Sequence, residues 1–225
     1  MLVSYIFSDV PKHGYGLYVS EGSAERKGSL RKKIIGDGGG DCALAVMCHA
    51  AAESGERTGE AVGQLLKAFE YWFGHEFPES QYCFSPEVIK RYWYNMLCGV
   101  AKGAECGWDL AVMLVHAGRY VVLGMGEIVM YEYSFDKNRY RRIYAGQERK
   151  EFDLELGIPE EETADFSFLC RSISKKSLYL IVPRHICLEY PGKIMNNRHL
   201  QRWMSHLAGK VPCAAALVYG GGAVQ

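Results

Sequence analysis

The stretch GWDLAVMLVHAGRYVVLGMGEIVMYEY, residues 107–133, decides the fold of this chain. It contains three apolar runs, Leu110–Val115, Tyr120–Leu123 and Ile128–Tyr133, which are separated by short glycine-containing segments. Runs of this length that are rich in valine, leucine and tyrosine are typical of consecutive β-strands, so we expect a meander. Both faces of the first two strands are apolar, which requires another layer of the protein on each face. The stretch therefore predicts a sheet in the middle of a layered sandwich.

Helices and further strands are predicted on both sides of this stretch. Apolar side chains recur with helical spacing over Val62–Phe73, Val88–Ala101 and Leu200–Leu207. Ser85 and Pro86 are typical of the first positions of a helix. Short apolar runs predict the other strands: Leu2–Phe7, Gly16–Val19, Leu30–Ile35, Cys42–Cys48, Phe166–Cys170, Leu178–Val182 and Cys213–Tyr219.

The composition indicates a single intracellular domain spanning residues 1–225, since 48% hydrophobic content over this length supports one large core. The formal net charge is zero, so nothing global indicates binding to nucleic acid or to a membrane surface. We expect the basic clusters Arg31-Lys32-Lys33 and Arg139–Arg142 to be solvated strand ends or turns. The eight cysteines lack metal-site or disulfide spacing, which favours a cytoplasmic protein. No signal peptide is recognisable, and no apolar stretch approaches the roughly 20 residues that span a bilayer.

The order of these elements and the central stretch resemble the PPM-type, metal-dependent serine/threonine protein phosphatases. In that family a Gly-Thr-Thr opens a strand pair that ends in an Asn-Val-Gly-Asp-Ser-Arg turn, and Gly107-Trp108-Asp109 and Gly124-Met125-Gly126-Glu127 stand at the corresponding places here. The resemblance covers nearly the whole chain. It implies an α+β fold, a four-layer αββα sandwich of two stacked antiparallel sheets with helices on the outer faces. We expect Val62–Phe73 and Val88–Ala101 to form an antiparallel pair over one sheet, and Leu200–Leu207 to cover the other.

The family's chemistry requires carboxylates around two divalent cations, which polarise the phosphoryl group and activate a bridging water. An Asp-Gly-x-Gly turn should precede the first long helix, but His49 and Ala50 stand in the places of its Asp and Gly. A Ser-Asp-Gly should follow a late strand, where the chain has Arg184 in the Asp position and then His185. Cys213, preceded by a proline, replaces an Asp-Asn that leads into the last strand. The resemblance therefore implies a phosphatase-like domain that has lost its catalytic residues and metal ligands.

Three interpretations of this pattern stay open, and we favour the first. The first interpretation is a non-catalytic pseudophosphatase domain that acts in signalling as a binding or regulatory module, with a protein partner and no cofactor. The second is a divergent, active phosphatase that holds Mg²⁺ or Mn²⁺ with carboxylates recruited from Glu53, Glu56, Asp37, Asp41 or Glu127. The third is an interaction protein whose resemblance to the family is coincidental. None of them fixes the partner or the oligomeric state.

If the degenerate motif positions converge in space, the pocket that holds the cations in the family is lined by basic residues in this chain. His49, Arg184 and His185 would then line it, and a guanidinium offers the paired donors that suit phosphate or carboxylate oxygens. We therefore expect weak binding of an anion or of a phosphorylated partner there, without hydrolysis. In the alternative, Arg184 and His185 lie exposed on a loop while His49 packs in the core.

Overall fold

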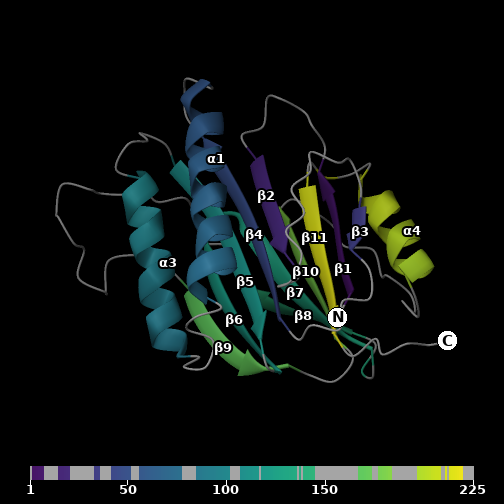
Figure 1. The fold of residues 1–225 in the computed structure, drawn as a ribbon. Coiled ribbons are helices and arrows are strands. Elements are labelled where there is room, and N and C mark those ends of the chain that lie inside the picture. Colours follow the sequence, from purple (N-terminus) through teal and green to yellow (C-terminus); the bar gives the residue numbers. More distant parts are fainter. Residues whose placement is uncertain are drawn as a thin grey trace.

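The protein folds into layers of strands and helices (Figure 1). In the described part of the chain the helices are α1 (Glu56–Tyr71), α3 (Pro86–Ala101) and α4 (Asn197–Ala208), and a π-helical turn, η1 (Trp72–Glu76), extends α1. The strands are β1 (Leu2–Phe7), β2 (Tyr15–Ser20), β3 (Lys33–Ile35), β4 (Cys42–Ala51), β5 (Gly107–His116), β6 (Arg119–Met125), β7 (Ile128–Ser134), β8 (Arg139–Tyr144), β9 (Ser167–Ser172), β10 (Ser177–Pro183) and β11 (Cys213–Tyr219). This computed structural model describes residues 2–7, 15–20, 33–35, 42–51, 56–77, 85–101, 107–116, 118–135, 137, 139–144, 167–173, 177–183, 197–208, 211 and 213–219.

The strands form two antiparallel sheets that lie face to face. The six-stranded sheet has the order β3-β1-β11-β10-β7-β8, and the five-stranded sheet has the order β2-β4-β5-β6-β9. All neighbouring strands in both sheets are antiparallel. Helices α1 and α3 lie side by side on the outer face of the five-stranded sheet, and α4 covers the six-stranded sheet (Figure 1). The predicted four-layer αββα sandwich is confirmed.

Strand alternation distributes the apolar side chains among three core layers. Along β4, Leu44 and Val46 pack against α1 and α3, whereas Ala45 and Met47 point between the two sheets. We call this second region the inter-sheet layer. The third layer lies between α4 and the six-stranded sheet and includes Trp203. Strands β5 and β6 are buried along nearly their whole length, as the apolar character of both their faces predicted.

Aromatic contacts join α1 to α3. The ring of Trp93 on α3 meets the rings of Phe69 and Trp72 edge-on, at centroid distances of 6.0 and 5.7 Å. In the π-helical turn the backbone N–H of Phe77 donates to the carbonyl of Trp72, and both side chains are buried in the same core layer. The predicted helical stripe therefore continues through the turn. None of the helices in the described part of the chain has the length and apolar character that a membrane span requires.

The central stretch differs from the predicted three-stranded meander. Strands β5 and β6 pair with each other, but β7 leaves the five-stranded sheet and pairs with β8 and β10 in the six-stranded sheet. The turn at Gly126-Glu127 thus carries the chain from one sheet to the other. The apolar pattern could not distinguish these arrangements, because β7 has buried residues on both faces, as a strand within a meander between two layers would also have. Arg139–Arg142, expected as a strand end or turn, begins the edge strand β8.

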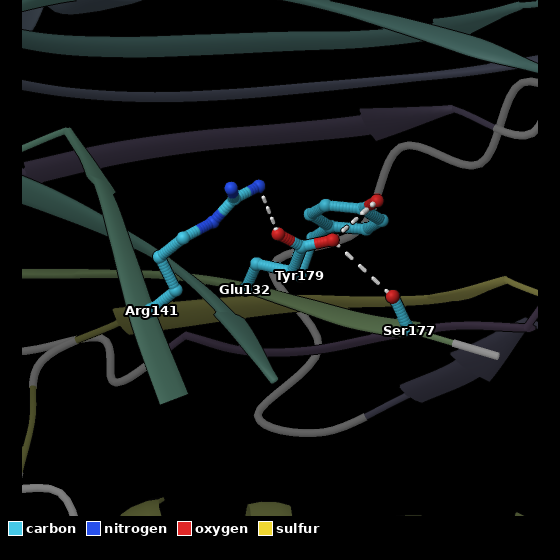
Figure 2. A network of polar contacts seen from close by, with 4 residues as sticks. All are labelled: Glu132, Arg141, Ser177 and Tyr179. Carbon is cyan, nitrogen blue, oxygen red and sulfur yellow. Dashed lines mark hydrogen bonds and ion pairs between the residues drawn. The ribbon is translucent and has the colours of Figure 1, made fainter. Parts of the chain in front are cut away.

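A buried carboxylate joins three strands of the six-stranded sheet (Figure 2). Glu132 on β7 is 4% exposed and accepts hydrogen bonds from the guanidinium of Arg141 on β8 and from the hydroxyls of Ser177 and Tyr179 on β10, the last two at 3.3 Å. Burial, and then the charge of Glu132, raise the pKa of Tyr179, so this hydroxyl keeps its proton at neutral pH. A buried charge is stable only when its partners satisfy it, so this network holds β7, β8 and β10 together.

We expect Arg141→Ala to lower the free energy of unfolding by about 3 kcal/mol, because it leaves the buried Glu132 carboxylate without its cation. Arg142 is the matched control, since it is exposed and points to the other face of the same strand. Arg142→Ala should change stability by no more than about 0.5 kcal/mol. Urea unfolding of both variants makes the comparison, and equal losses would show that the network does not hold the sheet.

Candidate functional site

His49 and Asp109 form an ion pair at one end of the inter-sheet layer. The strand register places them directly opposite each other on β4 and β5. The Nδ1 atom of His49 lies 2.8 Å from the Oδ2 atom of Asp109. Asp109 is 1% exposed, and the side chain of His49 is 13% exposed. This carboxylate is therefore removed from water and depends on protein partners for its stability.

The second carboxylate oxygen of Asp109 holds the turn between β6 and β7. Its Oδ1 atom accepts a hydrogen bond of 2.9 Å from the backbone N–H of Glu127. The preceding residue, Gly126, has a φ of 66°, and a Cβ atom there would lie 2.1 Å from Oδ1 of Asp109. Both the backbone conformation and the available space thus require glycine at this position. One oxygen of Asp109 orients an imidazole, and the other fixes the crossing between the sheets.

Tyr15 completes a row of three side chains on adjacent strands. It lies opposite His49 in the register of β2 and β4, and its ring stacks on the imidazole with a centroid distance of 4.2 Å and an angle of 25° between the planes. The stacked ring restricts the imidazole plane from one side, while Asp109 holds it from the other. The row Tyr15–His49–Asp109 is our candidate site.

The structure describes three of the five residues predicted for the degenerate metal pocket. His49 belongs to the row, whereas Ala50 follows it on β4 and faces the α1–α3 layer, 2% exposed. Cys213 begins β11 and is fully buried in the inter-sheet layer. Arg184 and His185 lie outside the described residues. The convergence of His49, Arg184 and Cys213 in one pocket therefore stays a prediction.

Sequence analysis did not identify the partners of His49. Asp109 carried a signal that could have been used, because a carboxylate within a strand that is buried on both faces needs a partner. Tyr15 and the backbone N–H of Glu127 carried no such signal, since their contacts depend on strand register and on the turn. His49 and Ala50 themselves lie within β4, which continues to Ala51, and not in a turn after it.

The buried cysteines near this end of the layer are poor nucleophiles. Burial raises the pKa of Cys48 from 9.0 to about 12, although a hydrogen bond with the backbone of Gly16 opposes the shift. Burial, and then the nearby Cys48, raise the pKa of Cys213 above its usual range. Thiolates are therefore suppressed at neutral pH. Cys48 faces the helices while His49 faces the inter-sheet layer, so the two do not form a nucleophile–base pair.

The donors that the structure describes in this region do not suit a pair of divalent cations. Mg²⁺ and Mn²⁺ are held in such sites by several carboxylate and water oxygens. Asp109 contributes the carboxylate here, and protein donors engage both of its oxygens. Within the described parts of the chain, no three His, Cys, Asp or Glu side chains group closely enough to hold a metal ion. The arrangement can instead present an oriented imidazole, which carries a positive charge when protonated.

Solved structures share this fold, although no family model and no curated protein matches the sequence. The serine/threonine phosphatase of S. agalactiae is similar with a TM-score of 0.64 and 8% identity, over 97% of this chain and 99% of that chain. The phosphatase PstP of Mycobacterium tuberculosis is similar with a TM-score of 0.62 and 10% identity, over 97% and 100% of the two chains. This chain has the PPM-phosphatase fold.

Two further structures with the PPM fold come from a metal-bound phosphatase and from a signalling assembly. The PstP catalytic domain was solved with two manganese ions, with a TM-score of 0.57 and 9% identity over 96% of this chain and 99% of that one. A protein from a study of the bacterial stressosome, a modular system adapted to control secondary messenger signalling, matches with a TM-score of 0.56 and 10% identity over 97% and 98%. At these identities the fold is shared, so the chemistry must be argued from this chain's own residues.

We expect Gly126→Ala to destabilise the protein by about 2–4 kcal/mol, since it combines a left-handed backbone conformation with a clash against Asp109. Gly63 in α1 is the matched control, because a Cβ atom there meets nothing within 4 Å. Gly63→Ala should raise the free energy of unfolding by about 0.5–1 kcal/mol through better helix propensity. The two changes should have opposite signs in thermal or urea unfolding, and two losses of similar size would contradict the assigned role of Gly126.

Alkaline pH should weaken the fold through Cys48. Its thiol has a pKa of about 12 in the folded protein against 9.0 ordinarily, so the folded state keeps this proton at pH values where the unfolded state loses it. The thiol's contribution is thus complete below pH 9 and is lost as pH rises from 9 towards 12. We expect Cys48→Ala to lose less unfolding free energy than the wild type over this pH range. If the unfolding free energies of the two proteins fell equally with pH, the raised pKa of Cys48 would be wrong.

Proposed function

We propose that this chain is a pseudophosphatase, a PPM-fold module that binds or regulates a protein partner without hydrolysing phosphate esters. One observation carries the proposal. At His49, where the family resemblance expects a metal-binding aspartate, the chain has an imidazole, and the nearby carboxylate of Asp109 is bound to that imidazole and to the β6–β7 turn. The imidazole thus takes, from within the protein, the place beside the carboxylate that a cation would otherwise occupy.

An anionic or phosphorylated partner is the ligand class that this charge change supports. Protonation of His49 would add a positive charge at the end of the inter-sheet layer, and the chain has Arg184 and His185 at the other degenerate motif. The stressosome protein gives a precedent for this fold in a signalling assembly. We extend the proposal to a cytoplasmic signalling role for a single domain.

The second candidate is a divergent, active metal-dependent serine/threonine phosphatase. Of its proposed ligands, Glu127 is the one whose side chain belongs to the described structure, where it is half-buried and its backbone contacts Asp109. The others, whose side chains lie outside the described residues, are Asp37, Asp41, Glu53 and Glu56. Glu127 therefore offers the direct test between an enzyme and a binding module.

Calorimetric titration with Mn²⁺ and Mg²⁺, combined with an aryl-phosphate assay in each ion, separates the two candidates. We expect neither saturable metal binding nor metal-dependent turnover, because protein groups already occupy both oxygens of the carboxylate at the site. Glu127→Gln should behave as the wild type in both measurements. Metal-dependent turnover that Glu127→Gln abolishes would replace the pseudophosphatase with the enzyme.

A further inference from the structure

Three arginines gather at the open side of the inter-sheet layer, where the last strands of the two sheets lie. Strand β8 ends the six-stranded sheet and β9 ends the five-stranded sheet. Arg139 shares a strand face with Arg141, whose partner Glu132 points into the inter-sheet layer. Arg171 shares a face of β9 with Leu169, which packs against that layer. All three arginines are exposed, and we call Arg139, Arg141 and Arg171 the basic rim.

A chain of contacts through the inter-sheet layer shows that arginines from opposite sheets approach the same point. Tyr120 on β6 is fully buried, pairs with Arg171 in the register, and packs its ring 5.2 Å from that of Tyr179. Tyr179 donates to Glu132, which binds Arg141 (Figure 2). Burial, and then Glu132, raise the pKa of Tyr120, while Arg141 and Arg171 both oppose this shift. The charges of both guanidiniums therefore reach the Tyr120 hydroxyl from opposite sheets.

The positive charge of the basic rim is only partly compensated within the described residues. Glu132 neutralises Arg141, and this pair is part of the network that holds the sheet. Arg139 and Arg171 form no ion pair with any other residue that the structure describes. Exposed guanidiniums without counter-charges attract anionic groups and bind carboxylates or phosphates through paired donors. Arg139 and Arg171 thus carry the uncompensated charge of the rim. Arg141 gives one N–H to Glu132, which fixes β8, and its half-exposed guanidinium keeps further donors for a ligand.

We propose that the basic rim docks an acidic, extended segment of a partner protein. The inference rests on the proposed binding function and gives it a surface. Side chains two residues apart on a strand, such as those of Arg139 and Arg141, lie roughly 6.6 Å apart along it. Alternate side chains of an extended peptide have the same spacing, so acidic residues at every second position match the rim.

Other anionic partners fit the described surface less well. Binding of single-stranded nucleic acid uses exposed aromatic rings for stacking, but Tyr120 and Tyr179 at the rim are buried. A membrane-binding surface adds apolar side chains to its basic ones. The exposed large apolar residues of the described chain lie instead on α1 and α3: Tyr71, Val88 and Tyr92. An acidic peptide needs neither feature.

Fluorescence anisotropy tests the proposal with a labelled peptide of alternating glutamate and threonine, alone and with its threonines phosphorylated. The double variant Arg139→Glu/Arg171→Glu should weaken binding about tenfold or more, because it replaces attraction with repulsion. The matched control is Arg91→Glu/Arg202→Glu, which reverses two exposed arginines on α3 and α4. It should bind within about twofold of the wild type, since screened charges away from the rim contribute little. Circular dichroism melts confirm that both variants are folded.

Several results would overturn the proposal. Peptide binding that is absent, or that falls equally in both double variants, would remove the rim as a docking site. Tighter binding to single-stranded RNA or to anionic vesicles would assign the rim to those ligands. Residues 148–165 carry eight acidic and two basic side chains and connect β8 to β9 in the sequence. Peptide binding that appears only after these acids are neutralised would indicate an intramolecular ligand.

The experiment also separates the rim from the pseudophosphatase proposal. Peptide binding that is lost in His49→Ala and kept in the rim variant would move docking to the candidate site, which overturns the rim and leaves the non-catalytic function standing. Metal-dependent turnover by a protein whose rim still binds the peptide would have the opposite meaning. It would contradict the pseudophosphatase and support the docking surface.

Discussion

The buried carboxylate of Asp109 is the constraint on which this end of the structure depends. An ionised group that has lost its water must find donors inside the protein. Asp109 finds one in the backbone at the sheet crossing and another in the ring of His49. The first contact determines where the chain changes sheets, and the second determines how the imidazole is oriented. The same charge thereby connects the folding of the central stretch with the chemistry that the site can offer.

A second buried carboxylate, Glu132, has the corresponding role at the β8 side of the inter-sheet layer. The two sites differ in the cation that each carboxylate faces. Arginine stays charged at every physiological pH, so the partner of Glu132 is permanent and the network is structural. Asp109 instead faces the imidazole of His49, which is not a permanent charge. The interior between these sites is apolar, with Met47, Met113 and Leu217 among its buried residues.

The architecture could be predicted from the sequence, because the spacing of apolar residues and the length of each apolar run indicate helices and strands. Helical stripes and apolar runs predicted the three helices and most strands within a few residues, and the family resemblance supplied their arrangement in layers. Two features escaped. The change of sheet before β7 does not alter the alternation of side chains along the strand, so the sequence pattern does not reveal it. Strand β8 was not predicted as a full strand, because an exposed edge strand tolerates a polar, arginine-rich sequence.

The candidate site was predictable only in part, since it depends on register as well as on residue type. A motif comparison was enough to select His49, but its neighbours Tyr15 and Asp109 come from strands that are 34 and 60 residues away in the sequence. Ala50 and Cys213 were selected by the same comparison, and the structure places both in buried packing positions. Arg184 and His185 fall outside the described residues, so their part in the site rests on sequence alone.

The salt link between His49 and Asp109 also changes how the fold responds to its surroundings. A protein whose acidic cluster is neutralised by a bound cation gains stability in proportion to the logarithm of the free ion concentration. Here the partner of the carboxylate, the imidazole of His49, is covalently part of the chain and is always present at the same effective concentration. The hydrogen bond between these two side chains therefore needs no ion from solution. A chelator, which removes a bound cation from solution, cannot remove this partner of the carboxylate.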